Sequence, residues 1–306
     1  MEVTLAANFN MASTLSSTGS LERARVHFDR AVALFPAVQP STLIAFIGWD
    51  YRFVGLADRA VCLWLLGYPD AALKDCEQAL LGARESGNFA SFAHTVPPAT
   101  FVQLGCGRYD LTIALADELE GLSRERDLTL FASSGKLIRG SVAARTGSAL
   151  IAAESITAAE AVLLNAGTTV WTPETKTNLA IAHARLGRFD LARQSIRDAL
   201  DHIERTKETM SEADVHRTAG EIALLSPDRD STEANLCFQR ALDIARAQRA
   251  RSWELRAATS LARLWRDQGN RQEAHGLLAP VYGWFTEGFD TLDLKEAKTL
   301  LDELAR

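Results

Sequence analysis

The sequence predicts an all-α solenoid built from repeated helical hairpins. Four glycines, Gly67, Gly107, Gly147 and Gly187, each follow the previous one by 40 residues. A small residue lies seven positions before each of these glycines, and another lies five positions after it. Apolar side chains recur at helical spacing on both sides of each glycine, which indicates two amphipathic helices joined by a tight turn. A fixed period of this length is the signature of a repeat array.

The repeated unit has a physical explanation that is clearest in the segment 177–205. Gly187 fits the position just past the first helix, where the backbone turns left-handed and a side chain is penalised. Ala180 and Ala192 flank this turn. Two helices joined by so short a turn must cross closely, and a bulky side chain at the crossing would force them apart. The unit is therefore a helix, a turn and a second antiparallel helix.

The same pattern places about seven hairpins and a terminal capping helix along the chain. The first hairpin turns at Gly19, the second to fifth at the four glycines of the period, and the seventh at Gly269. The sixth replaces the turn glycine with the longer segment 226–231. We expect one solenoid domain over residues 1–306, because each repeat packs on its neighbours and no linker is present. The expected hairpins span residues 1–36, 41–87, 90–127, 129–166, 172–206, 211–249 and 252–287, and the capping helix spans residues 293–304.

The pattern of small and aromatic residues around a glycine turn resembles that of the tetratricopeptide repeat (TPR), whose usual period is about 34 residues. The additional residues of the present period, about six per unit, would lengthen the helices by more than one turn. The resemblance implies a TPR-like α-solenoid, a right-handed superhelix in which the first helix of each hairpin lines the concave face.

Composition and motifs exclude several classes of function. The formal net charge of −6, with mixed signs throughout, argues against a nucleic-acid partner. No apolar run is long enough for a membrane span, and the N-terminus lacks a secretory signal, so we expect a cytoplasmic protein. The segment 133–136 (SSGK) resembles part of a phosphate loop, but Leu130 stands where that motif needs a glycine, and we expect a structural loop there. No two histidines have the spacing of a metal pair, and we predict no enzyme activity, no cofactor and no metal.

The concave face is the surface on which we expect a partner. Residues about ten, six and three positions before each turn glycine are expected to face the groove, which makes its middle apolar and its C-terminal end basic. A protein or peptide partner would then place apolar side chains in the middle and acidic groups at the basic end. Two alternatives stay open: the groove is filled by the protein's own side chains, or it holds a small molecule near Trp64 and Phe101. The candidate partner-binding residues are Val61, Trp64, Phe101, Ile181, Arg256, Arg263 and Arg266.

The C-terminal segment 252–304, and WFTEGFDTLDL within it, resembles the closing repeats of a family of large bacterial signalling proteins. The resemblance covers residues 47–306 and is weaker between residues 111 and 166. Those proteins join an effector, often a class III adenylate/guanylate cyclase or a winged-helix DNA-binding domain, to a STAND/AAA ATPase and a TPR-like region. The sequence contains no cyclase motif, Walker A loop or winged helix, so none of the family's catalytic residues has a counterpart here. The resemblance implies a regulatory module for a linked ATPase/cyclase or transcriptional effector.

The aromatic residues Trp284, Phe285 and Phe289 of the same segment have two interpretations. They pack the terminal helix over the last hairpin as the cap that solenoids require. Alternatively, they form an exposed patch for homodimerisation or for docking an effector domain.

Overall fold

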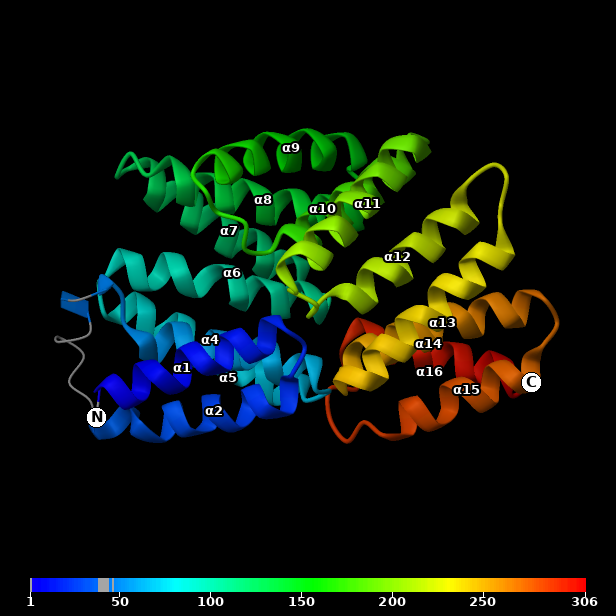
Figure 1. Ribbon diagram of the computed structural model, residues 1–306, viewed down its shortest axis with the longest axis horizontal. Coiled ribbons are helices and arrows are strands. Elements are labelled where there is room, and N and C mark those ends of the chain that lie inside the picture. The colour runs from blue at the N-terminus through cyan, green and yellow to red at the C-terminus, as the bar shows by residue number, and fades with distance from the viewer. Residues whose placement is uncertain (1, 38–43, 46) are drawn as a thin grey trace.

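The computed structural model describes residues 2–37, 44–45 and 47–306, and every regular element in these ranges is helical. Residues 41–43, at the expected start of the second hairpin, lie outside the described residues. Successive helices pack in antiparallel pairs along the chain (Figure 1). The helices are α1 (Glu2–Ser17), α2 (Leu21–Leu34), α4 (Tyr51–Leu65), α5 (Pro69–Glu85), α6 (Phe89–Gly105), α7 (Tyr109–Arg124), α8 (Thr129–Thr146), α9 (Ala149–Asn165), α10 (Thr172–Arg185), α11 (Phe189–Thr206), α12 (Glu212–Leu225), α13 (Ser231–Gln248), α14 (Arg251–Asp267), α15 (Arg271–Gly283) and α16 (Leu292–Leu304), with a short 3-10 helix, η1, at Phe35–Ala37.

The turn glycines have the left-handed backbone that the repeat pattern predicts. Gly187, between α10 and α11, has a φ of 72°, and Gly67, between α4 and α5, has a φ of 89°. Ala180 and Ala192 are completely buried where α10 crosses α11. In the sixth hairpin the Asp230 carboxylate accepts hydrogen bonds from the first backbone N–H groups of α13 and so caps that helix in place of a glycine turn. The predicted all-α fold of helical hairpins is confirmed.

One local prediction is wrong. The segment 133–136 is not a loop but lies inside α8. Gly135 stands where α8 crosses α7 so closely that a Cβ atom would lie 2.8 Å from the Ala116 carbonyl oxygen. The glycine in SSGK therefore serves helix packing, and the helical periodicity around it was the stronger signal.

The array bends until its last repeats meet its first. Helices α6 to α11 arch over one side of the molecule, and α14 to α16 return to lie beside α4 and α5 (Figure 1). The Ser252 hydroxyl on α14 donates to the Trp64 carbonyl at the end of α4. Arg256, one turn further along α14, donates to the Gly105 carbonyl at 2.9 Å. Trp253 belongs to the same hydrophobic core as α1 and α4, so the two ends of the array share one core.

Three reciprocal hydrogen bonds hold the C-terminal loop against the second hairpin. The Glu287 carboxylate accepts from the backbone N–H groups of Asp70 at 3.0 Å and Ala71 at 3.1 Å. These N–H groups lie in the first turn of α5 and have no intrahelical partner. In return, the Asp70 carboxylate accepts from the Gly288 N–H at 3.0 Å. We call the contacts of α14 and loop 284–291 with α4, α5 and α6 the closure.

Alanine substitution at two turn glycines tests the closure. A Cβ at Gly67 would lie 2.5 Å from Cζ3 of Trp284, whereas a Cβ at Gly187 would meet nothing within 4 Å. Both residues have positive φ, so both substitutions share the conformational cost of a left-handed residue, about 1–2 kcal/mol. We expect Gly67→Ala to lower the free energy of unfolding by about 1–3 kcal/mol more than Gly187→Ala, because only Gly67→Ala also overpacks the closure. Urea unfolding of both variants measures this, and equal effects would contradict a closed array.

Candidate functional site

The interior of the closed array holds two larger cavities and a small space between them, which we call the neck because it shares lining residues with both. One, of about 330 Å³, is lined by α6, α7, α8, α10, α12, α14 and α16, and we call it the arginine cavity. The other, of about 530 Å³, lies between the N-terminal helices and loop 168–171 and is lined mostly by apolar groups; we call it the apolar cavity. The neck, of about 30 Å³, shares Arg145 with the arginine cavity and Glu174 with the apolar cavity. Both cavities have volumes typical of ligand sites, about 300–1,000 Å³.

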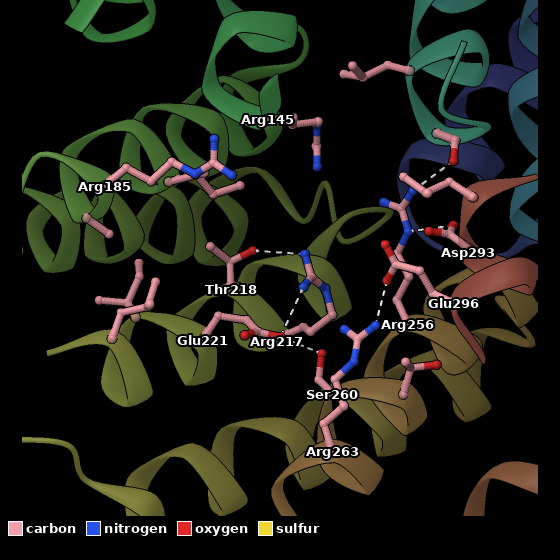
Figure 2. Close-up of a pocket in the computed structure, with 18 of the residues that line it drawn as sticks. Arg145, Arg185, Arg217, Thr218, Glu221, Arg256, Ser260, Arg263, Asp293 and Glu296 are labelled. Atoms are coloured by element: carbon pink, nitrogen blue, oxygen red, sulfur yellow. Dashed lines mark hydrogen bonds and ion pairs between the residues drawn. The ribbon is translucent and has the colours of Figure 1, made fainter. Parts of the chain in front are cut away.

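Five arginines from four helices line the arginine cavity (Figure 2). Arg256 and Arg263 on α14 pair with the α16 residues Asp293 and Glu296, each at 2.7 Å. On α12, Arg217 pairs with Asp214 at 2.7 Å and with Glu221 at 3.6 Å. Three of the five guanidinium groups are thus neutralised within the protein. The arginines in the cavity are Arg145, Arg185, Arg217, Arg256 and Arg263.

The field of these arginines acts strongly on Asp214, which lines the neck. Burial by itself disfavours the ionised carboxylate. The positive charges of Arg217, Arg256 and Arg145 outweigh that effect, so the pKa of Asp214 lies below its usual value. The carboxylate therefore stays ionised at neutral pH, and the net field in this part of the interior is positive.

Arg145 is the exception to the pairing. Its Nε is buried without a hydrogen-bond partner, and no carboxylate of the described residues lies within 4.0 Å of its guanidinium. Burial lowers the pKa of Arg145 to about 10, and the nearby positive charge of Arg256 adds to the effect. Figure 2 shows its side chain directed into the cavity with no interaction drawn to it. Arg185, exposed at the edge of the cavity, also has no ion pair among the described residues.

The apolar cavity has the opposite electrostatic character. Its lining includes the carboxylates of Asp58, Glu174 and Glu208, and it includes no lysine or arginine of the described residues. Asp58 accepts one long hydrogen bond, 3.4 Å, from Ser13. Burial raises the pKa of Asp58 to about 7, an effect that the Ser13 hydroxyl reduces only in part.

Glu174, at the boundary of the apolar cavity and the neck, also has a pKa that is raised by burial. It accepts a hydrogen bond from the Ser211 hydroxyl but has no cationic partner among the described residues. Burial raises its pKa to about 7, and the negative charges of Glu208 and Asp214 act in the same direction. Neither Asp58 nor Glu174 has a cationic partner among the described residues, and the hydrogen bonds that each accepts offset the effect of burial only in part.

The neck exposes one further polar group. The Asn178 amide nitrogen donates to the Ser141 hydroxyl at 3.2 Å, whereas the amide oxygen is buried without a partner. Buried side-chain polar atoms are bonded in the large majority of cases. An unpaired acceptor between the two cavities is therefore available to a bound N–H donor.

The structure brings most of the predicted partner-binding residues to the interior, but not to an open groove. Val61 and Trp64 are 3% and 2% exposed. Trp64 packs edge-on against Phe101 at 5.5 Å and Trp253 at 4.9 Å between ring centroids. Closure of the array buries these side chains, and Val61 and Phe101 line the apolar cavity. Their part in binding a partner stays a prediction.

The predicted basic strip faces acidic groups of the same chain. Ile181, Arg256 and Arg263 line the arginine cavity. Arg266 lies outside it and pairs with Glu303 of α16 and with Asp267. The segment that meets the arginines is thus α16, which a partner's acidic group would have to displace.

The predicted C-terminal docking residues have three different environments. Phe285 is buried with α16 in the C-terminal core. Trp284 is partly buried, with Tyr68 edge-on at 5.7 Å and the Arg251 guanidinium 5.0 Å over its ring. Phe289 is 48% exposed. Two of the three residues therefore pack within the protein, and dimerisation or effector docking at this segment stays a prediction.

The sequence predictions missed Arg145, Asp58, Glu174 and Asn178. Arg145 lies two positions before Gly147, and Asn178 lies nine positions before Gly187, each next to a position predicted to be concave. A charged or amide side chain beside the predicted concave positions was the signal available. Over residues 2–37, 44–45 and 47–306, no group of three His, Cys, Asp or Glu residues could hold a metal ion.

Comparisons with known proteins identify the fold. No family model and no curated protein matches the chain. Its structure is similar to apo RapI, with a TM-score of 0.56 and 10% identity over 98% of this chain and 99% of that one. A Rap protein complexed with competence and sporulation factor has a TM-score of 0.63 and 11% identity over 98% and 80% of the chains. A tetratricopeptide repeat protein from Parabacteroides merdae ATCC 43184 has a TM-score of 0.51 and 11% identity over 99% of both chains.

These likenesses show a TPR-like all-helical repeat fold, as the sequence predicts. Within the described residues, no helix combines the length and the hydropathy that a membrane span requires.

Proposed function

We propose that this chain is a regulatory protein-interaction module that binds an anionic group of a protein or peptide partner in the arginine cavity. The observation that carries the proposal is Arg145, a partly buried side chain whose guanidinium Nε is buried without a hydrogen-bond partner. A buried unpaired charge costs folding free energy. A carboxylate bound there would form charge-assisted, bidentate hydrogen bonds in an interior with little competing water.

The arrangement of the arginines supports a regulatory role. Arg145 and Arg185 lie on helices of adjacent hairpins, and Arg256 and Arg263 lie on the last hairpin. An anion that contacts arginines of several hairpins would favour the compact form of the array over more open forms. It would also compete with Asp293 and Glu296 for Arg256 and Arg263, which couples binding to the position of α16.

The comparisons and the C-terminal resemblance support the same proposal. One similar structure, a Rap protein, was determined in complex with competence and sporulation factor, so an array of this fold accommodates a partner. We propose that here the consequence is control of a linked ATPase/cyclase or transcriptional effector in the cytoplasm, as the C-terminal resemblance implies.

A second candidate function is the sensing of a small molecule in the apolar cavity. The observation that favours it is an internal volume of about 530 Å³ beside Phe101 and Trp171, within the range of small-ligand sites.

Removal of the unpaired guanidinium tests the main proposal. The probe is a mixture of short random-sequence peptides with acetylated amino ends, prepared with either free or amidated carboxyl ends, and binding is followed by tryptophan fluorescence. We expect the free-carboxyl mixture to bind more tightly. We expect Arg145→Met to weaken its binding about tenfold or more, because a charge-assisted hydrogen bond is lost.

The control variant is Arg188→Met, in the exposed turn between α10 and α11. We expect it to bind both mixtures as the unaltered protein does. Arg145→Met removes an uncompensated buried charge, so the empty variant should be at least as stable as the unaltered protein. Equal binding of free and amidated mixtures, or no effect of Arg145→Met, would rule the proposal out.

A further inference from the structure

Charge is separated along the interior of this protein. The arginine cavity carries five arginines against the three carboxylates of Glu221, Asp293 and Glu296. The apolar cavity carries three carboxylates and no lysine or arginine of the residues described. The neck is next to both cavities, since Leu104 of α6 lines all three spaces. A ligand that fills the whole interior would thus meet acidic groups at one end and basic groups at the other.

The carboxylates of the apolar cavity lack the cation that would stabilise them. The salt bridge nearest in sequence to Asp58 belongs to Arg59, which pairs with Asp75 at 2.7 Å and with Asp29 at 3.2 Å and so is already neutralised. Glu174 has only the Ser211 hydroxyl as its side-chain partner. An ammonium or guanidinium group bound in this cavity would provide each carboxylate with the missing charge-assisted hydrogen bond.

The neck has a hydrogen-bond acceptor and an apolar wall, which suit a peptide backbone better than a charged group of the ligand. The Asn178 amide oxygen, which has no partner in the protein, is the acceptor that we assign to a peptide N–H group there. The aromatic rings of Phe101 and Trp64 form its apolar wall. The apolar cavity beyond it, with Phe131, Val170 and Trp171 in its lining, accommodates apolar side chains.

We propose that the interior binds a short peptide in one direction, with its basic amino end beside Asp58 and Glu174 in the apolar cavity and its carboxyl end beside Arg145. This inference rests on the proposed function and extends it to the acidic end of the interior. Two oppositely charged ends matched to two oppositely charged cavities disfavour the reversed peptide, because each end would then meet a like charge in a poorly hydrated site.

Binding of a cationic end makes the affinity depend on pH. Asp58 and Glu174 have pKa values of about 7 in the empty protein, so both are largely protonated at pH 6 and largely ionised at pH 8. The side chain of a basic first residue stays charged over this interval and binds the ionised forms of these carboxylates, so the affinity for that side chain rises with pH. His94, which also lines the cavity, has a pKa lowered by burial and stays neutral over most of it.

The other charged groups near the two carboxylates do not reverse this direction. Glu208 and Asp214 face Glu174 and add negative charge. From α1, Asp58 faces only the neutral Ser13 hydroxyl. The basic groups across the neck, Arg145 and Arg256, keep their charge throughout.

The test uses mixtures of short random-sequence peptides that begin with a basic residue. Four forms are prepared, in which the amino end is free or acetylated and the carboxyl end is free or amidated. We expect the doubly free form to bind most tightly. Acetylation combined with replacement of the basic first residue by norleucine should weaken binding about tenfold or more. The variants Asp58→Asn and Glu174→Gln, which keep side-chain shape and remove a buried charge, should abolish that preference together with the rise in affinity from pH 6 to pH 8.

Asp228→Asn, in the exposed turn before α13, is the matched control and should change neither readout. One outcome would overturn this inference and leave the proposed function in place. In it, the peptides show a preference for free carboxyl ends that depends on Arg145 but no preference at the amino end. Loss of the carboxyl preference alone would overturn the proposed function. Failure of every mixture to bind would overturn both the inference and the proposed function. Binding of 4-phenylbutylamine as tightly as the doubly free peptides would show that the cavity is a small-amine site and not a peptide site.

Discussion

Replacing Trp64 with alanine is expected to lower the free energy of unfolding by about 3–5 kcal/mol, the usual cost of truncating a large buried aromatic side chain. Trp64 is 2% exposed and lies between Phe101 and Trp253, with the Arg256 guanidinium 5.1 Å over its ring. Its neighbour Gly105 approaches so closely that a Cβ there would lie 2.6 Å from the indole ring. The cavity left by alanine would therefore open at the closure between α4, α6 and α14.

Chemical unfolding monitored by circular dichroism measures this effect. The control is Phe289→Ala, since Phe289 is 48% exposed, and we expect it to change the free energy of unfolding by no more than about 0.5 kcal/mol. The opposite pattern, with Trp64→Ala stable and defective only in partner binding, would show that Trp64 is a partner contact on an open groove, as the sequence alone suggests.

Replacing Asp293 with alanine is expected to destabilise the protein by about 3 kcal/mol, because it leaves the Arg256 guanidinium in the interior without its counter-charge. The Arg256 side chain is 13% exposed and joins Asp293 on α16 to the Gly105 carbonyl on α6. Loss of the carboxylate removes the ion pair that holds α16 against α14. Hydrogen exchange of the α16 amides should therefore increase more than that of the α10 and α11 amides.

Asp302→Ala is the matched control for this variant. Asp302 lies on the same helix and pairs with Lys298, but both side chains are more than half exposed. Pairs of this kind contribute about 0–1 kcal/mol. Equal effects of the two substitutions would mean that Asp293 acts as an ordinary surface carboxylate. Adding Arg256→Met to Asp293→Ala should recover part of the stability, since the unpaired charge is then removed as well.

The repeat architecture was predictable because its signals are local. A glycine with positive φ, an alanine at a helix crossing and an amphipathic stripe each act within one hairpin, as at Gly187 and Ala180. The irregular sixth turn was recognisable for the same reason. Where local signals conflicted, as at Gly135, the loop-like composition was misleading because close packing of α7 and α8 also requires a glycine.

The candidate site was only partly predictable, because it depends on contacts between distant repeats. The register of the first helices correctly placed Phe101, Ile181 and Arg263 toward the interior. It carried no information on which segment lies opposite them. Whether Arg256 meets solvent, a partner or Asp293 is decided by the position of α16, thirty or more residues away in the sequence.

By itself, then, the sequence determined the repeated unit of two helices and a turn. The tertiary structure decided that the array closes, that Trp64 is core rather than groove, and that Arg145, Asp58 and Glu174 remain without ionic partners in the interior. The reason is that each hairpin adds a small rotation to the array, and the position of the last hairpin is the sum of all of these rotations. A local pattern specifies each step, but the charges that meet across the interior depend on that sum.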